Sequence, residues 1–349
     1  MKKIYYSKSI LSPNTNLKKI IENLSKTQLQ ICFICKKKRL IGTVTDGDIR
    51  RALLKGIKLE DNIKNIMNKK FFSLENNCSY EKAKKLMSIY KINQIPVLNK
   101  KGDLINVFFS ETINVKKIID NPIIIMAGGF GKRLYPITKN CPKPLLPIGG
   151  KPVLEHIIKK IRNEGFKNII ISTHYLGEMI FEYFGDGSKF GVNIKYIDEE
   201  KPLGTAGCIS KFKNETKKPF LVCNGDVITD ISFEQILTHH LDHKADATMA
   251  VRKYILQNPF GVIKTKGNKI INIVEKPVAE TYVNAGIYAF NPIIKKHISS
   301  NKKTEMPQLF RHLKKKKLKT IVFPMHEDWL DIGNPKEYEK AQTKISKKA

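Results

Sequence analysis

The sequence lacks any long apolar run. No stretch approaches the roughly 20 consecutive apolar residues of a membrane span. The charged start, MKKIYYSKSILSPNTN, also lacks the continuous apolar segment of a secretory signal. We therefore expect a soluble, cytoplasmic protein that does not enter a membrane. With 349 residues, of which 41% are hydrophobic, the chain is long enough for two domains with real cores.

Acidic residues and arginine are both scarce. The net charge is +31, but only seven of the 63 basic residues are Arg. Residues 1–120 carry 25 basic against 10 acidic residues, and residues 121–349 carry 38 against 22. A nucleic-acid binder concentrates its charge and favours Arg for base contacts. The dispersed lysines therefore argue against nucleic acid as a partner, although their field can attract anionic substrates.

Cysteine is too sparse for a metal centre. Cys32 and Cys35 have Cys-x-x-Cys spacing, but they lie in the strand-like LQICFIC and no second pair exists. A structural metal site needs about four ligands. We expect these two residues to be buried or reduced structural thiols.

Two weakly similar segments fill the first third of the chain. Each contains a helical pattern and two short strand-like runs joined by a basic turn. In the first segment the helices are expected at 16–24 and 46–56, with strands at 29–35 and 40–45. In the second, a helix is expected at 79–91 and strands at 94–99 and 104–109.

This pair resembles two CBS (cystathionine-β-synthase-like) modules, at about 7–57 and 63–118. The family's ligand pattern, Gly-x-x-Thr-x-x-Asp, falls on Gly42, Thr45 and Asp48. The resemblance implies that Thr45 and Asp48 hold adenine or another nucleotide, with helix N–H groups facing a phosphate. The second module reads NVFFSET at this place and lacks both side chains. The alternative is that the pair only folds, dimerises or docks.

From Pro122 onward, strands and helices alternate. Strand-like runs at 123–127, 166–173 and 218–226 flank a helical segment at 151–165 that has Pro at its start and Gly at its end. Fully apolar strands between helices indicate a parallel sheet that is covered on both faces. Ligands of such sheets bind beyond the carboxyl ends of the strands.

A glycine-rich loop follows the first of these strands. MAGGFGKRLYPITKNCPK lacks the Ser or Thr that follows Lys in a Walker A loop, and Leu134 stands where a dinucleotide fingerprint has its third Gly. The loop still offers backbone N–H groups to phosphate oxygens, with cations fixed beside them.

The segment AGGFGKRLYPITKNCPKPLL resembles the signature of sugar-1-phosphate nucleotidyltransferases (nucleoside-diphosphate-sugar pyrophosphorylases). Lys132 stands where the family often has Thr or Ser, and Ile137 where Leu is usual. The resemblance implies a Rossmann-like, mostly parallel α/β sheet of the GT-A-like kind over 119–349, preceded by a CBS-domain pair over 1–118. It also implies that a sugar-1-phosphate oxygen attacks the α-phosphate of a nucleoside triphosphate and that pyrophosphate leaves.

The resemblance assigns roles to particular residues. Arg133, Lys143 and Asp226 are expected to be catalytic, through charge neutralisation and positioning. Asp226 and Asp331, the latter in DWLDIGNPKEY, are expected to hold Mg²⁺. The expected nucleotide contacts are Ala127, Gly128, Gly129, Gly131, Gly204 and Thr205, and the expected sugar-phosphate contacts are Gly261, Glu275, Lys276 and Asn284.

The segment KPLGTAG (201–207) is most similar to the mannose-1-phosphate guanylyltransferase branch, which suggests GTP. The whole arrangement resembles bacterial nucleotidyltransferases with an N-terminal CBS pair, among them one that makes GDP-glucosamine from glucosamine-1-phosphate for legionaminic acid synthesis. We expect that reaction and a homo-oligomer. The alternatives are mannose-, heptose- or glucose-1-phosphate with CTP, UTP or dTTP, or a nucleotide-sensing protein without turnover.

Overall fold

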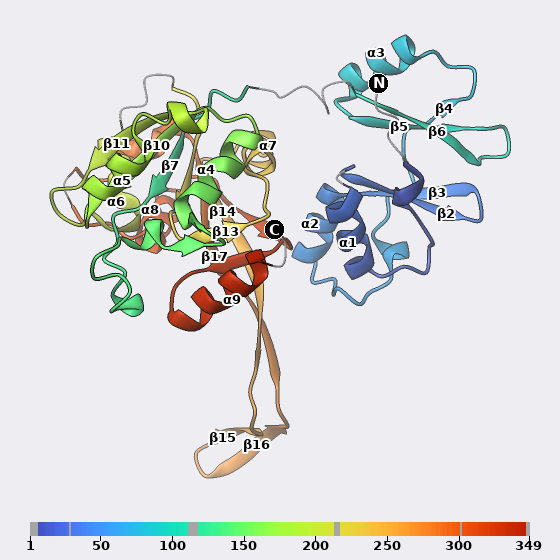
Figure 1. Cartoon of the computed structure of the whole chain (residues 1–349). Helices are drawn as coiled ribbons and strands as arrows, with labels where there is room; N and C mark the ends of the chain where they lie inside the picture. The colour runs from blue at the N-terminus through green and yellow to red at the C-terminus, as the bar shows by residue number, and fades with distance from the viewer. Residues whose placement is uncertain (1–5, 28, 111–117, 213–216, 301, 347–349) are drawn as a thin grey trace. The chain divides into compact units, whose positions relative to one another are not determined.

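The computed structural model describes residues 6–27, 29–110, 118–212, 217–300 and 302–346. The chain forms two compact units, Met1–Lys116 and Lys117–Ala349, which are described one at a time (Figure 1). Among the described residues, no helix has the length and apolar character needed to cross a bilayer.

The N-terminal unit contains two three-stranded sheets of the same topology, in the orders β1-β2-β3 and β4-β5-β6. In each sheet a short first strand runs parallel to the second, and the second pairs antiparallel with the third. The two predicted repeats are therefore confirmed as structural repeats. The elements are β1 (Ile10–Leu11), α1 (Leu17–Thr27), β2 (Ile31–Lys36), β3 (Arg39–Thr45), α2 (Asp46–Leu54), β4 (Leu74–Glu75), α3 (Tyr80–Tyr90), β5 (Gln94–Leu98) and β6 (Leu104–Phe109).

The predicted thiols lie in two hydrophobic clusters: Cys32 in the core of the first repeat, and Cys35 in a cluster to which both repeats contribute. Cys32 and Cys35 are buried and free, and burial raises the pKa of the Cys32 thiol to about 12. Burial, followed by the charge of Asp103, raises the pKa of the Cys35 thiol to about 11. Thiols with such high pKa values are neutral structural groups, because the thiolate is the form that binds metals. The end of the second expected module, 111–118, lies almost entirely outside the described residues.

The C-terminal unit is built on a seven-stranded sheet, ordered β11-β10-β7-β12-β17-β14-β18. Only β17 runs antiparallel to its neighbours, so the sheet is mostly parallel, as expected. Its strands are β7 (Ile123–Met126), β10 (Asn168–Thr173), β11 (Asn193–Asp198), β12 (Phe220–Asn224), β14 (Ala247–Gln257), β17 (Val278–Phe290) and β18 (Thr320–Met325).

Helices cover both faces of this sheet. Along β7, Ile123 and Ile125 belong to one hydrophobic core while Ile124 belongs to the other, because successive strand side chains point to opposite faces. The first core receives side chains from α4 (Val153–Asn163), α5 (Gly177–Phe184), α7 (Phe233–Asp242) and α9 (Pro335–Ser346). The second receives them from α6 (Gly204–Lys211) and α8 (Met306–Lys315). This two-sided burial explains why the strands are apolar without alternation.

Three small two-stranded sheets complete the unit. They pair β8 (Pro147–Ile148) with β9 (Lys151–Pro152), β13 (Val227–Thr229) with β19 (Trp329–Asp331), and β15 (Val262–Lys266) with β16 (Lys269–Val274). The third is the tip of a long two-stranded ribbon formed by the outer parts of β14 and β17 (Figure 1). We call residues 254–282 the arm.

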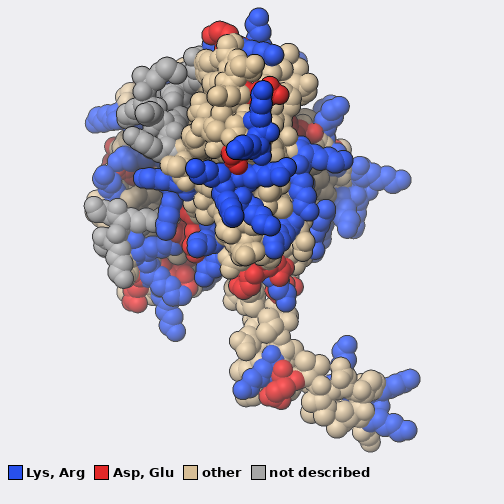
Figure 2. All heavy atoms as spheres, turned by 90° about the vertical axis from the view of Figure 1, so that its right-hand side faces the viewer, with Lys and Arg blue, Asp and Glu red and all other residues tan. Residues whose placement is uncertain are grey.

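The arm leaves the sheet as an isolated ribbon. Figure 2 shows it extending from the rest of the unit, with long parts that carry neither basic nor acidic side chains. Every residue of the arm except Asn258 and Pro277 is exposed.

Candidate active site

Two neighbouring strands end together at the carboxyl edge of the large sheet. Met126, at the end of β7, is in register with Asn224 at the end of β12. Just beyond, the Gly225 amide donates a hydrogen bond to the Met126 carbonyl at 2.8 Å. A Cβ at Gly225 would lie 2.8 Å from that carbonyl oxygen, so only glycine allows this approach. The contact places Asp226 next to the start of the glycine loop.

The glycine loop (127–131) is held from several sides. The Ala127 amide donates to the Ser172 carbonyl at 2.8 Å. Gly131 has a φ of +64°, and a Cβ there would lie 2.8 Å from the Thr138 side chain. At Gly129, by contrast, a Cβ would meet nothing within 4 Å. The loop is therefore anchored at both ends and open in the middle, as a backbone that approaches a phosphate must be.

A lysine and an aspartate meet beside this loop. Lys143 is buried at the start of a 3₁₀ turn, Lys143–Leu145, and forms an ion pair with the Oδ2 of Asp226. The other carboxylate oxygen of Asp226, Oδ1, is buried and has no hydrogen-bond partner in the described part of the chain. A buried carboxylate oxygen without a partner is costly unless a cation or a donor group binds to it.

A second aspartate reaches the same place through the pairing of β13 with β19. This pairing sets Val227 opposite Asp331, and the Ile332 amide donates to the Asp226 carbonyl at 3.1 Å. The pKa of Asp331 is raised, first by burial and then by the negative charge of Asp226, while Lys143 and Arg133 act in the opposite direction. The two carboxylates are therefore close enough to repel each other.

The guanidinium of Arg133 lies near the carboxylate of Asp331. A Cβ built on Gly333 would be 3.4 Å from Nη1 of Arg133 and 3.4 Å from both carboxylate oxygens of Asp331. Arg133 is exposed on the short turn Lys132–Leu134 that follows the glycine loop. The structure thus brings together four charged residues from distant parts of the sequence: Arg133, Lys143, Asp226 and Asp331.

This group suits a divalent cation. Mg²⁺ prefers carboxylate oxygens completed by phosphate oxygens and water. Asp226 offers a buried oxygen without a partner among the described residues, and the pKa of Asp331 is raised by burial and then by the charge of Asp226. A cation between them would relieve both costs, because it neutralises two like charges in a partly dry site.

The substitution Asp331→Asn should remove the Mg²⁺-dependent stabilisation of the protein. An acid whose pKa is raised on folding makes its full contribution to the stability of the protein at pH values below its ordinary pKa of about 3.9. This contribution is lost as the pH rises through the raised pKa. At neutral pH the ionised Asp331 therefore opposes folding, and the metal-free variant should melt at least as high as the wild type. Thermal melts at pH 7 with and without Mg²⁺ measure this. A wild-type response to Mg²⁺ in the variant would contradict a metal role for Asp331.

Asn284, one of the predicted sugar contacts, lies close to the charged group. Its amide donates to the Tyr288 hydroxyl at 2.7 Å, and its Oδ1 accepts from the Gly286 amide at 3.0 Å. Burial raises the pKa of Tyr288 to about 12, and the charge of Asp226 contributes to the shift. Gly286 in turn packs against Asn224, since a Cβ on Gly286 would lie 2.7 Å from the side-chain amide nitrogen of Asn224.

Tyr288 and Asn224 are not among the site residues predicted from the sequence. The Oδ1 of Asn224, like that of Asp226, is buried without a hydrogen-bond partner among the described residues. The sequence signal was the polar Asn224-Gly225-Asp226 after an apolar strand, from which only the aspartate was chosen. Tyr288 gave no signal, because it looks like any aromatic residue in the buried strand NAGIYAF.

Gly204 and Thr205 open α6, as the turn expected at 201–207 predicts. The Thr205 hydroxyl donates to Glu305 at 2.9 Å and accepts from the Met306 amide at 2.7 Å. Gly204 has a φ of +77°, and a Cβ there would lie 2.7 Å from the Thr304 carbonyl. These groups join α6 to the start of α8. Their role in reading a base stays a prediction.

The other three predicted sugar contacts lie on the arm, away from the charged group. Gly261 and Glu275 face each other near its tip, since a Cβ at Gly261 would lie 2.8 Å from the Glu275 carboxylate. Lys276 follows directly, with a φ of +43°. From Asn284 to Val278 the strand β17 spans six residues, or about 20 Å, and Lys276 lies further out.

In the N-terminal unit, the two predicted ligand residues cap α2. The Thr45 hydroxyl donates to the Asp48 carboxylate at 2.7 Å, and the Asp48 amide donates back to that hydroxyl at 3.4 Å. Asp48 also pairs with Arg51 at 2.6 Å. Their ligand role stays a prediction, because these contacts are also those of an ordinary capping box.

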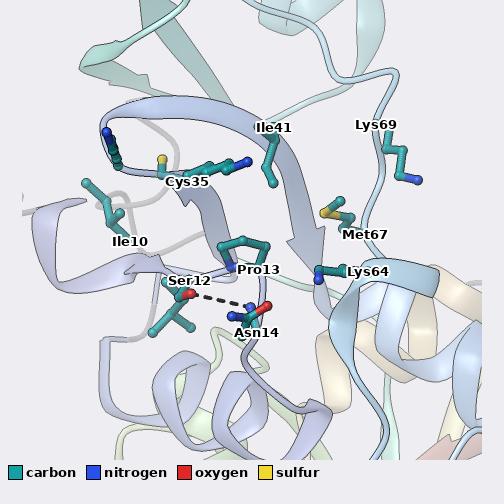
Figure 3. Close-up of a pocket in the computed structure, with 12 residues that line it drawn as sticks. Ile10, Ser12, Pro13, Asn14, Cys35, Ile41, Lys64, Met67 and Lys69 are labelled. Atoms are coloured by element: carbon teal, nitrogen blue, oxygen red, sulfur yellow. Dashed lines mark hydrogen bonds between the residues drawn. The ribbon is translucent and has the colours of Figure 1, made fainter.

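A cavity of about 740 Å³ lies within the first repeat, between the end of β2 and the segment that follows β1 (Figure 3). Met67, which lines it, also packs on Gly42, where a Cβ would lie 2.8 Å from the Met67 sulfur. No acidic side chain is among its described lining residues, whereas four lysines are: Lys36, Lys37, Lys64 and Lys69. Its charge therefore suits an anionic ligand.

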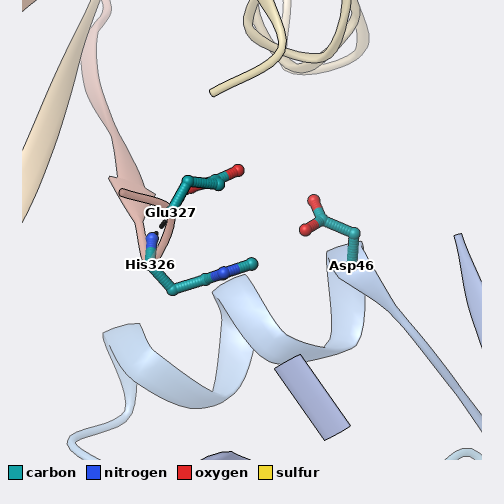
Figure 4. A group of neighbouring side chains, drawn as sticks. All are labelled: Asp46, His326 and Glu327. Atoms are coloured by element: carbon teal, nitrogen blue, oxygen red, sulfur yellow. Dashed lines mark hydrogen bonds between the residues drawn. The ribbon is translucent and has the colours of Figure 1, made fainter. Parts of the chain in front are cut away.

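Figure 4 shows three further polar side chains, which belong to different units of the chain. Asp46 opens α2 and pairs with Arg50 at 2.6 Å. His326 and Glu327 follow β18 in the C-terminal unit, where the Glu327 carboxylate accepts a hydrogen bond from the His326 amide at 2.9 Å.

Comparison with known families separates the two units in the same way. Residues 122–348 match the Nucleotidyl transferase family, and residues 8–55 and 63–110 each match the CBS domain. The chain is 34% identical over 224 residues to a D-glycero-α-D-manno-heptose 1-phosphate guanylyltransferase of Aneurinibacillus thermoaerophilus, covering 64% of this chain and 97% of that protein.

Two further similarities concern the same unit. A mannose-1-phosphate guanyltransferase of Yarrowia lipolytica is 35% identical over 227 residues, and the match covers 62% of this chain and 61% of that protein. The crystal structure of HddC from Yersinia pseudotuberculosis complexed with GMP-PN superimposes with a TM-score of 0.52 at 26% identity. That match covers 64% of this chain and 99% of HddC.

Proposed function

The chain belongs to the nucleotidyl transferase family and is a sugar-phosphate nucleotidyltransferase, and we propose that it transfers GMP from GTP onto glucosamine-1-phosphate. The products are GDP-glucosamine and pyrophosphate. The observation that carries the transfer reaction is the group formed by Arg133, Lys143, Asp226 and Asp331 beside the glycine loop.

The site has the charges that this reaction needs. The attacking phosphate oxygen is already ionised at neutral pH, so the main obstacle is repulsion between two polyanions. Fixed positive groups that meet the charge of the reacting phosphates lower this barrier. We assign Arg133, exposed beside the glycine loop, to the triphosphate and Lys143 to the α-phosphate.

Asp226 and Asp331 would hold Mg²⁺, which would neutralise phosphate charge and orient the triphosphate. Lys143 now pairs with Oδ2 of Asp226, which leaves Oδ1 for the cation. Ala127, Gly128, Gly129 and Gly131 would hold the phosphates through their backbone, and Asn284 a sugar hydroxyl or amine.

The choice of GTP rests on the sequence Leu203-Gly204-Thr205-Ala206-Gly207 and on the two similar proteins named as guanylyltransferases. Those names give heptose-1-phosphate and mannose-1-phosphate as acceptors, so both are candidates beside glucosamine-1-phosphate. A screen for pyrophosphate release tests the proposal, with GTP, CTP, UTP and dTTP against a panel of sugar-1-phosphates. Release with every pair at the rate of a metal-free control would refute it.

We propose further that the cavity of the N-terminal unit binds a nucleotide, such as an adenine nucleotide, with its phosphates toward the lysines. The charge of the lining supports this, because four lysines without an acid favour a polyanion. Thr45 and Asp48, at the N-terminus of α2, are not among the residues that line this cavity, so their assignment to a ribose is a separate proposal that rests on the motif alone.

Reversing one charge in this cavity should weaken nucleotide binding. Lys64→Glu replaces attraction by repulsion toward the phosphates, and we expect the Kd for ADP to rise by about tenfold or more, equivalent to roughly 1.4 kcal/mol. Isothermal titration of the full chain measures it. Lys55→Glu, an exposed lysine after α2 and outside the cavity, is the matched control. Equal Kd values for the two variants would place the nucleotide elsewhere.

A further inference from the structure

The arm exposes more apolar surface than a free two-stranded ribbon can sustain. Phe260 is 74% exposed and Ile271 is 61% exposed, and the apolar residues of β15 and β16 are exposed on both faces. An isolated two-stranded hairpin is marginally stable at best in water. Contiguous apolar patches above a few hundred Å² on a soluble protein mark a surface that contacts something else.

The size of this surface suits a stable protein interface. Twelve large apolar side chains are exposed along the arm. At roughly 100 Å² each, they offer on the order of 1,000 Å². A standard interface buries about 800 Å² per partner, so one arm could supply a full side of such an interface.

The arm also carries three of the four residues that the resemblance predicts as sugar-phosphate contacts. Gly261, Glu275 and Lys276 lie about 20 Å or more along the ribbon from Asn284, which stays beside the charged group. The ribbon is continuously paired from Gln257–Val278 to Arg252–Val283. In this conformation a chain therefore cannot place its own Lys276 next to its own Asp226.

We propose that the arm binds the transferase unit of a second copy of this chain, where Glu275 and Lys276 of the partner subunit complete the sugar-phosphate site. This inference rests on the proposed function. Every copy has an exposed apolar arm and a transferase site far from its own Glu275 and Lys276. If two copies exchange arms around a two-fold axis, each arm is covered and each site receives these two residues. Lys276 adds a cation for the sugar phosphate, and Glu275 accepts from sugar hydroxyls.

Complementation between two inactive variants tests this exchange. We call the part of the transferase site that lies outside the arm the body; it contains Arg133 and Asp226. Asp226→Asn disables the body, and Lys276→Ala disables the arm. The two are co-expressed in the full chain with different tags, and the mixed dimer is isolated by sequential affinity steps. In that dimer, the body of the Lys276→Ala copy meets the intact arm of the Asp226→Asn copy. One complete site forms, with about half of the wild-type activity per dimer and at least about tenfold more than either variant alone.

Two controls separate exchange from other causes of activity. The pair Asp226→Asn and Arg133→Ala places both changes in the body, and the pair Lys276→Ala and Glu275→Gln places both in the arm, so neither pair should regain activity. Failure to isolate any two-tag complex overturns the exchange, and so does a mixed dimer without restored activity. Either result would mean that the arm acts within its own chain or is covered by another part of it.

Activity measurements on the wild type and on Lys276→Ala distinguish a failure of this inference from a failure of the proposed function. A wild-type protein that turns over, with a Lys276→Ala variant equally active, leaves the transferase reaction in place and removes the role of the arm. A wild-type protein without turnover on any substrate pair removes the proposed function, and the exchange with it.

Discussion

Replacing Asp226 by Asn should lower kcat by at least about 10³-fold, because a carboxylate that holds the cation is worth several kcal/mol to the transition state. The Asn side chain keeps the volume and can still accept a hydrogen bond from Lys143, so the fold should survive. The loss should therefore appear in pyrophosphate release and leave the circular dichroism spectrum unchanged.

A matched control for this variant lies on the same sheet. Asp198 ends β11 and is exposed, so Asp198→Asn makes the same chemical change outside the charged group. We expect kcat of this control within about twofold of the wild type, as for an ordinary surface substitution. Wild-type rates in Asp226→Asn would remove Asp226 from the reaction and, with it, the assignment of the site.

Replacing Arg133 by Ala should lower kcat by about 10²–10³-fold, the range expected when one fixed donor to developing charge is lost. Arg133→Lys should recover only part of this, because an ammonium cannot donate to two phosphate oxygens in the fixed fork of a guanidinium. Steady-state rates with saturating GTP and sugar-1-phosphate separate the effect on kcat from any effect on KM.

Arg162 provides the comparison for this second variant. It lies on α4, where its guanidinium contacts the Asn163 side chain and the Phe190 carbonyl. Arg162→Ala removes the same charge from the same unit but not from the reaction site, so its kcat should stay near that of the wild type. Equal losses in the two variants would point to a general effect of net charge and against a role for Arg133 at the phosphates.

The elements of the two units could be predicted because their signals are local. The apolar runs of β7, β10 and β12 and the helical pattern of α4 are each set by burial of neighbouring residues. The resemblance of the glycine loop to a family signature, with Lys143, Asp226 and Asp331 following it in order, also indicated the reaction class. A motif can predict a reaction class from the sequence alone when only a few residue types can perform the chemistry at its positions.

The spatial arrangement of the site needed the tertiary structure. Asp226 and Asp331 meet only because β13 pairs with β19, and no local pattern fixes a pairing between segments so far apart in the sequence. The engagement of Thr205 with Glu305 is equally non-local. The sequence by itself therefore determined which residue types the chain offers to a phosphate-transfer site. Only the tertiary structure decided which of them share one site and which, on the arm, lie far from it, because strand pairing and strand length are properties of the whole sheet.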